Sequence, residues 1–355
     1  MRRGLMRWNA EELPLAVLQE RTARLQAAMR QENLQALLVY TNLVRPSAVT
    51  WLTGFTPYWS EGLLLVGRDG APTFATALSK RVASWIRSVS PLGEILNAPR
   101  PGTALGQRVA ADTSVCRIGV VELDALPSGS YDDFSAAAPA VELLDATALF
   151  AGARRGADAA ERHLLARADA IAVAALEQVD AAGATDAGSV AGAIEKHARL
   201  AGAEEVYITV ASDLMADRRM IRPSAVALGD IFALRASIAY KGCWVRRART
   251  FAKDAAARAA MARGDAWFAQ VVQSIAPGKP LADQINTQVQ AFGAKLESWM
   301  AESCVGSYPL QVIASSRSSS NGAPATGDFV VLSLALTIDG VPWVGAAPLI
   351  VGAAL

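Results

Sequence analysis

Side chains that commonly act as metal ligands or nucleophiles are scarce in this sequence. Its 355 residues include 2 His and 3 Cys. Two histidines leave little room for a His-rich metal site, and three scattered cysteines cannot form a disulfide framework, which indicates a reducing compartment. His163 and His197 lie among charged residues on predicted helices, where solvated or capping roles are favoured over catalysis.

Nucleophilic catalysis lacks an obvious base. A thiolate at Cys243 or Cys304 would need a neighbouring base, and neither histidine is well placed to serve. A serine nucleophile would have to use a lysine or a carboxylate, and sequence spacing pairs none of these with a serine. Packing roles are therefore favoured for both cysteines.

The composition excludes several classes of partner. Because 34 Lys+Arg face 33 Asp+Glu, the net charge is +1 and no basic excess is available to bind nucleic acid. Charged residues interrupt the start of the chain at 9–12, and Asp339 and Gly340 interrupt its most apolar stretch. We therefore expect no signal peptide and no membrane span, and we predict a soluble, cytoplasmic protein.

Hydrophobic patterning predicts two domains. A hydrophobic content of 52% and a mean hydropathy of +0.24 provide enough apolar surface for two cores at roughly 150 residues per domain. The first part reads as an α/β domain with helices over 20–29 and 80–89 and strands at 36–40, 62–66, 73–76 and 118–123. A Gly- and Arg-rich linker at 152–156 sets the predicted domains at 1–152 and 153–355.

The second domain has a repeated pattern. Two predicted helices precede strands, and the same order follows again, with a glycine between the helices of each half at Gly183 and Gly278. The expected helices cover 159–181, 186–200, 254–275 and 281–301, and the expected strands cover 206–210, 231–240, 242–251, 304–314, 329–337 and 348–351. The pattern predicts an internally duplicated α+β domain.

Landmarks in both domains carry a family resemblance. They are Glu20-Arg21, Leu37-Leu38-Val39, Trp51-Leu52-Thr53-Gly54-Phe55, Gly229-Asp230, Tyr240-x-Gly242, Arg249-Thr250-Phe251 and Gly327. In their order and separation they resemble the creatinase/aminopeptidase P family, whose Tyr-Leu-Thr-Gly-Phe element is similar to residues 51–55. The resemblance implies an α/β creatinase-like N-terminal domain, a duplicated α+β pita-bread C-terminal domain, and a homodimer.

The resemblance also implies where a metal centre would lie. Peptidases of this family hold two divalent metals with two Asp, one His and two Glu, a donor set that suits hard cations. The two Asp positions carry Arg235 and Arg246, the His position carries Ser307, the first Glu position carries Ser333, and the final Glu falls near Gly345. Because guanidinium groups repel a dication, we expect no metal, no cofactor and no metallo-aminopeptidase activity.

A cationic cavity is predicted in place of the metals. Strand alternation places Ser237 on the face of Arg235, and Trp244 on the face of Arg246. Paired arginines grip a carboxylate bidentately, although acidic neighbours that neutralise both arginines are the open alternative. Arg222 stands just before a proline, where the family has a substrate-binding His, and adds positive charge ahead of the cavity strands.

These residues predict a metal-independent enzyme of specialised metabolism that acts on a small carboxylate-bearing substrate by C–N bond hydrolysis, elimination or rearrangement. The predicted catalytic residues are Arg235, Arg246, Ser307, Tyr308 and Ser333, and the predicted substrate-binding residues are Trp244, Ser237, Arg222 and Tyr240. The arginines would anchor the anion and stabilise developing charge, while Ser307, Tyr308 or Ser333 would orient the reacting group. The alternative is a non-catalytic pseudo-peptidase that serves as a binding or scaffolding protein.

Overall fold

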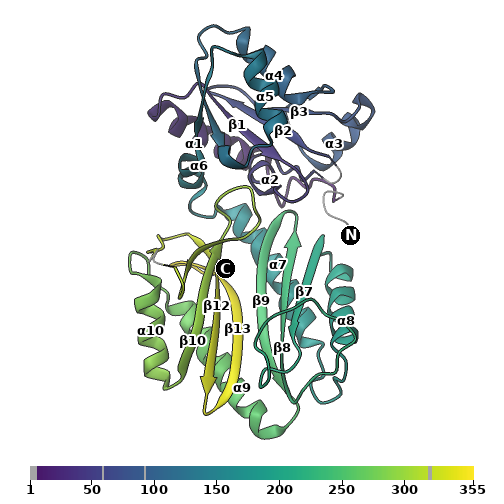
Figure 1. Ribbon diagram of the computed structural model, residues 1–355, viewed down its shortest axis with the longest axis vertical. Coiled ribbons are helices and arrows are strands. Elements are labelled where there is room, and N and C mark those ends of the chain that lie inside the picture. The colour runs from purple at the N-terminus through teal and green to yellow at the C-terminus, as the bar shows by residue number, and fades with distance from the viewer. Residues whose placement is uncertain (1–5, 58–59, 92, 319–321) are drawn as a thin grey trace. The chain divides into compact units, whose positions relative to one another are not determined.

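The chain forms two compact units in the computed structural model, which describes residues 6–57, 60–91, 93–318 and 322–355 (Figure 1). The N-terminal unit contains the described part of Arg2–Arg155 together with Cys304–Gln311, and the C-terminal unit contains Gly156–Ser303 and Val312–Leu355. The main division falls within the predicted linker, but the transfer of Cys304–Gln311 to the N-terminal unit was not expected.

The N-terminal unit is built on a six-stranded mixed sheet with the order β4-β3-β2-β1-β5-β6. The strands are β1 (Ala36–Thr41), β2 (Gly62–Gly67), β3 (Thr73–Thr76), β4 (Glu94–Asn97), β5 (Arg117–Val121) and β6 (Glu142–Asp145). Central strand β1 pairs antiparallel with β2 and parallel with β5. All of its residues are buried, which explains its uninterrupted apolar sequence.

Helices cover both faces of this sheet. On one face Leu37 and Val39 pack with α1 (Leu15–Gln31), α2 (Ser47–Thr53), α3 (Ala83–Val89) and α6 (Thr147–Arg154). On the other face Leu38 and Tyr40 pack with α4 (Pro101–Ala110) and α5 (Ser128–Ala137). Short 3-10 helices occupy Lys80–Val82 and Leu123–Ala125. The predicted α/β architecture of this region is confirmed.

The C-terminal unit is built on a seven-stranded sheet with the order β11-β10-β12-β13-β9-β8-β7. The strands are β7 (Glu205–Ala211), β8 (Ile231–Tyr240), β9 (Cys243–Ala252), β10 (Lys295–Ser303), β11 (Gln311–Ser315), β12 (Phe329–Ile338) and β13 (Val341–Ile350). Helices α7 (Ala159–Glu177), α8 (Ala187–Leu200), α9 (Ala255–Ser274) and α10 (Leu281–Phe292) complete it. Two helices followed by strands occur twice, as the repeated pattern predicts.

The two faces of this sheet differ. Leu332, Leu334 and Leu336 of β12 are buried in one core with Trp267 and Phe268 of α9, whereas the alternate residues of β12 are only partly buried. We call the side of the sheet that carries Leu332, Leu334 and Leu336 the helix face. The register places Ser333, Ala346, Ala248 and Arg235 in one row across β12, β13, β9 and β8, and we call their side the Arg235 face.

Three expected element boundaries are wrong. The helix predicted to reach residue 301 ends at Phe292, because Gly293 adopts a left-handed conformation (φ 76°) that closes it. The following residues form β10, which pairs antiparallel with β12. Residues 304–310, expected in a strand, form a loop before β11, and the last strand begins at Val341 rather than near residue 348.

Candidate functional site

Two arginines lie in neighbouring rows of the Arg235 face. Arg235 pairs with Thr209 on β7 and with Ala248 on β9. The next row contains Tyr207, Ser237 and Arg246, and Trp244 lies one row further. The prediction that Arg235, Ser237, Arg246 and Trp244 share a face is therefore confirmed by the strand register.

Arg246 has an acidic partner that the sequence did not reveal. Its Nη1 donates to the Glu302 carboxylate, and its Nε donates to Ser237 Oγ at 3.0 Å. The two charged side chains are 17% and 6% exposed, so this is a nearly buried ion pair. Glu302 belongs to β10, which β12 and β13 separate from β9. The pairing depends on the coiling of the sheet, which residue periodicity does not specify.

Arg235 lacks such a partner. Its Nε donates to Thr209 Oγ1 at 3.0 Å, and across the described residues its guanidinium forms no ion pair with a carboxylate. Burial, followed by the positive charge of Arg246, lowers the pKa of Arg235, whereas Glu302 acts in the opposite direction. One carboxylate thus stands beside two guanidinium groups. An anionic ligand bound at Arg235 would relieve this imbalance.

An aromatic pair borders the arginines. The rings of Tyr207 and Trp244 are stacked, with centroids 5.6 Å apart and planes 12° from parallel. Trp244 is buried, whereas Tyr207 is 55% exposed. Glu205 lies beyond Tyr207 on the same face and strand. The face therefore combines a cationic group, an ion pair and an exposed aromatic ring.

Ser333 belongs to the same face at the level of Arg235. Its Oγ is buried and has no hydrogen-bond partner within the part of the chain that is described. Gly345, near which the resemblance places the final Glu position, pairs with Leu334 and lies on the helix face. Ala346 stands opposite Ser333.

Two predicted substrate-binding residues lie elsewhere. Tyr240 is an odd number of residues from Arg235 on β8, so its side chain is on the helix face, where the Arg167 guanidinium lies 6.0 Å from its ring centroid. The prediction that Tyr240 shares a ligand with Arg235 is therefore wrong. Arg222 is exposed in the connection between β7 and β8, directly after the isolated bridge of Ile221 with Val210.

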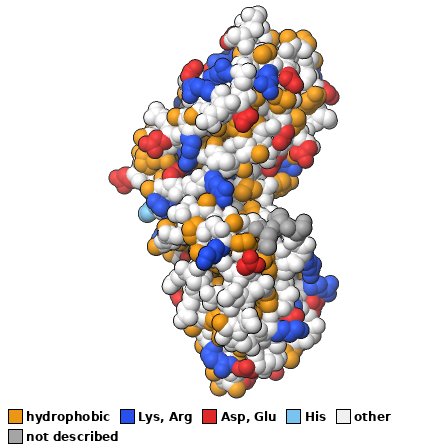
Figure 2. Space-filling view, turned by 90° about the vertical axis from the view of Figure 1, so that its left-hand side faces the viewer, with side chains coloured by type: hydrophobic (Ala, Val, Ile, Leu, Met, Phe, Trp, Pro, Cys, Tyr) orange, Lys and Arg blue, Asp and Glu red, His pale blue; other side chains and the backbone are white. Residues whose placement is uncertain are grey.

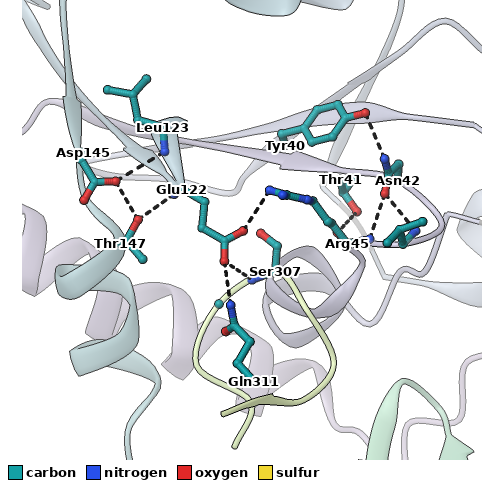
Figure 3. A network of polar contacts seen from close by, with 12 residues as sticks. Tyr40, Thr41, Asn42, Arg45, Glu122, Leu123, Asp145, Thr147, Ser307 and Gln311 are labelled. Atoms are coloured by element: carbon teal, nitrogen blue, oxygen red, sulfur yellow. Dashed lines mark hydrogen bonds and ion pairs between the residues drawn. The ribbon is translucent and has the colours of Figure 1, made fainter. Parts of the chain in front are cut away.

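Ser307 and Tyr308 lie in the N-terminal unit (Figure 3). Ser307 is 2% exposed. Its amide donates to Glu122 Oε1 at 3.3 Å, and its carbonyl accepts from the Ser47 amide at 2.9 Å. The Arg45 guanidinium stands 4.6 Å from the centroid of the Tyr308 ring. These two residues are therefore part of a polar network of the N-terminal unit.

Glu122 is the centre of this network, and no motif in the sequence singles it out. It adopts a left-handed conformation (φ 56°), which is strained for a non-glycine residue. Its carboxylate accepts from Gln311 Nε2 at 3.2 Å and pairs with Arg45 at 3.4 Å. A Cβ atom at Gly306 would lie 2.4 Å from Glu122 Oε1. A larger residue at position 306 would therefore have to displace the Glu122 carboxylate.

The residues present do not fit the two-metal centre that the resemblance implies. Within the described ranges, no group of three or more His, Cys, Asp or Glu side chains is arranged to hold a metal ion. The Arg235 face instead presents two guanidinium groups, which repel a dication. No step involving a metal is therefore assigned to this face.

One face of the surface bears on the prediction that the chain does not bind nucleic acid. On the side shown in Figure 2, basic and acidic side chains are interspersed rather than gathered by sign, as expected for a chain of net charge +1. None of the helices in the described residues has the length and apolar character needed to cross a membrane.

Comparisons with known proteins identify the fold. Residues 21–155 match the family described as creatinase/prolidase N-terminal domain. A comparison with curated proteins gave no match. The structure is similar to Xaa-Pro dipeptidase from Bacillus anthracis (TM-score 0.74, 18% identity, covering 94% of this chain and 95% of that one). It is also similar to prolidase from Pyrococcus horikoshii OT3 (TM-score 0.71, 14% identity, 94% and 96% coverage).

A third similar structure comes from a subunit of a protein complex. It is the N-terminal domain of the FACT complex subunit SPT16 from Cicer arietinum, chickpea (TM-score 0.65, 15% identity, covering 95% of this chain and 94% of that one). At these identities the likeness concerns the fold, which hosts more than one function. The predicted creatinase-like and pita-bread architecture is confirmed.

Proposed function

We propose that this chain is a metal-independent enzyme. It carries a creatinase/prolidase N-terminal domain and has the pita-bread fold of prolidases, consistent with the creatinase/aminopeptidase P family. It binds a small carboxylate-bearing substrate on the Arg235 face and acts at a C–N or similar bond by hydrolysis, elimination or rearrangement. Its place is in specialised metabolism, in the cytoplasm, and it acts as a homodimer.

The unmatched charge of Arg235 is the observation that carries this proposal. Arg246 is held by Glu302 and Ser237, so its guanidinium has limited capacity for a ligand. Among the described residues Arg235 donates through its Nε to Thr209 alone, and its two Nη groups keep the planar geometry that grips a carboxylate. Arg235 is therefore the substrate anchor, and Arg246 stabilises the site as a fixed positive charge beside it.

We propose the groups that act on the bound substrate from the hydrogen bonds that their side chains can make. Ser333 Oγ is a buried hydroxyl on the same face with no partner among the described residues, so it can donate to or accept from a substrate atom. Ser307 and Tyr308 are kept as candidates for orienting the reacting group, and Trp244, Ser237 and Arg222 as substrate-binding residues.

Binding of carboxylic acids against their uncharged amides tests the proposal. Calorimetry with small amino acids, their N-acyl derivatives and the matching amides should show acids binding more tightly than amides. Arg235→Gln should weaken acid binding about 10- to 100-fold, because it removes charge-assisted hydrogen bonds. Arg249→Gln is the matched control, since Arg249 lies on the helix face of the adjacent strand. Equal binding of acids and amides would refute the proposal.

Metal independence has a separate test. Elemental analysis of the purified protein should find no stoichiometric Mn, Co or Zn, and turnover of any acid that binds should survive treatment with EDTA. Loss of turnover on chelation, with recovery when metal is added, would show that the metal-independent part of the proposal is wrong.

The second candidate is a non-catalytic binding or scaffolding protein. Two observations favour it: Arg246 is already neutralised by Glu302, and a domain of a multi-subunit complex has a similar fold. Under this alternative no acid of the panel is turned over, and Arg235→Gln leaves the catalytic assays unchanged because there is no activity to lose.

A further inference from the structure

An exposed aromatic ring lies beside the proposed carboxylate anchor. Tyr207 pairs with Ser237, and Arg235 is two residues before Ser237 on the same strand. Tyr207 and Arg235 are therefore diagonal neighbours on adjacent strands and on one face, a relation with a separation of about 7–8 Å that long side chains bridge readily. One ligand can contact both side chains.

The orientation of the Tyr207 ring is fixed by its stacking on Trp244. Trp244 is buried and stacks nearly parallel to Tyr207, while more than half of the surface of Tyr207 is exposed. A tyrosine exposed to this degree on an edge strand would normally sample several rotamers. Stacking on Trp244 selects one of them, so a planar platform is held next to Arg235.

We infer that the ligand of the Arg235 face carries a planar aromatic group next to its carboxylate. Arg235 binds the carboxylate through its Nη groups, and the Tyr207 ring stacks on the aromatic part of the ligand. This inference rests on the proposed function and names its substrate class, aryl carboxylates. An aliphatic acid of the same size would keep the ionic contact and lose the stacking.

The charges of the face favour an anion over a cation at this platform. An aromatic pair can also bind ammonium groups, and Glu205 and Glu302 lie on the same face. Glu302 is committed to Arg246, however, and Arg235 stands unmatched at the side of Tyr207. A cation bound there would meet the guanidinium group and be repelled.

Three probes separate the two contacts. Benzoate has the ring and the charge, cyclohexanecarboxylate has the charge without the π system, and benzamide has the ring without the charge. Calorimetry on the full chain should show benzoate binding about 3- to 10-fold more tightly than cyclohexanecarboxylate, the range expected for one aromatic contact. Benzamide should bind most weakly.

Variants of Tyr207 assign the preference to this ring. Tyr207→Leu should abolish the difference between benzoate and cyclohexanecarboxylate, Tyr207→Phe should retain it, and Arg235→Gln should weaken both acids alike. Equal affinities of the wild-type protein for the two acids, with Arg235 still required, would overturn this inference and leave the proposed function standing. Failure of both acids to bind would overturn this inference, and failure of the amino-acid panel to bind as well would overturn the proposed function itself.

Discussion

The two faces of the C-terminal sheet differ in how many carboxylates are paired with their arginines. On the helix face, Arg247 donates to both oxygens of Asp169 on α7 at 2.6 and 2.7 Å, and Arg249 donates to Asp265 on α9 at 3.2 Å. On the Arg235 face, two arginines stand beside one carboxylate, Glu302. Where each arginine has its own aspartate the charge serves the fold, and where one charge is left over it is available to a ligand.

The difference follows from what packs against each face. Helices α7 and α9 lie against the helix face and bring Asp169 and Asp265 to the strands. On the Arg235 face, Glu302 of β10 pairs with Arg246, and Glu297 pairs with Arg218 near Thr337. Substitutions on the helix face should therefore act on stability, and substitutions at Arg235 should act on binding.

Trp343→Ala should give the largest effect. Trp343 is 1% exposed, makes edge contacts with Trp267 and Phe268, and donates to Asp265 at 2.9 Å. Its removal should lower the free energy of unfolding by about 3–5 kcal/mol, because it leaves a cavity and a partly buried carboxylate without this donor. Urea unfolding measures the loss, with benzoate affinity as the control. A loss below about 1 kcal/mol would contradict the structural role of the helix face.

Arg246→Leu should give the second largest loss in the free energy of unfolding. It leaves Glu302 almost buried without its main partner, which commonly lowers stability by about 3–5 kcal/mol. Arg235 interacts with the same carboxylate, so a smaller loss of about 2–3 kcal/mol is expected here. The double variant Arg246→Leu, Glu302→Leu should recover most of it in urea unfolding. If the double variant is less stable than the single one, the ion pair has a role beyond mutual neutralisation.

Asp265 should make the helix face sensitive to pH. Burial raises the pKa of Asp265 above its ordinary value of 3.8, against the hydrogen bond from Trp343 and the charge of Arg249. The folded state therefore holds the proton at a pH where the unfolded state has released it. This contribution to stability is present below pH 3.8 and is lost as the pH rises through the folded pKa.

Asp265→Asn should remove this pH dependence. The stability of the variant relative to the wild type should improve as the pH rises above 3.8, as measured by thermal unfolding in a series of buffers. Parallel pH profiles for the two proteins would show that the carboxyl titrates alike in the folded and unfolded states.

Arg249→Gln should have the smallest effect. The ion pair of Arg249 with Asp265 is largely exposed on the arginine side, and exposed pairs contribute about 0–1 kcal/mol. Unfolding by urea should change by no more than this, and carboxylate binding should not change. A clear loss of binding would remove the distinction between the two faces.

Local patterns in the sequence predicted most of this arrangement. The order of elements followed from hydrophobic runs, and strand alternation correctly placed Ser237 with Arg235 and Trp244 with Arg246. The same alternation, applied to Tyr240, would have assigned it to the helix face. The prediction for Tyr240 was wrong because a landmark at the end of a strand marks the turn and does not specify the face on which its side chain lies.

Contacts between distant residues could not be predicted. Glu302 meets Arg246 across two intervening strands, and Glu122 meets Ser307 across 185 residues of sequence. Neither spacing nor composition encodes such pairs, since they depend on how strands coil and on which unit a loop joins. The strand β10 was missed for a related reason, because residues common in helices are held there by pairing with β12.

The loop that contacts Glu122 affects when the N-terminal unit can complete its contacts during synthesis. The N-terminal unit takes in Cys304–Gln311, so its chain is complete only after most of the C-terminal unit has been translated. At about 5–20 residues per second, the ribosome needs roughly 10–30 seconds to travel from the end of α6 to this loop. During that interval Glu122, Ser47 and Arg154 lack the backbone partners that Gly306 and Ser307 later supply. The last contacts of the first unit must form after its own sequence has left the ribosome.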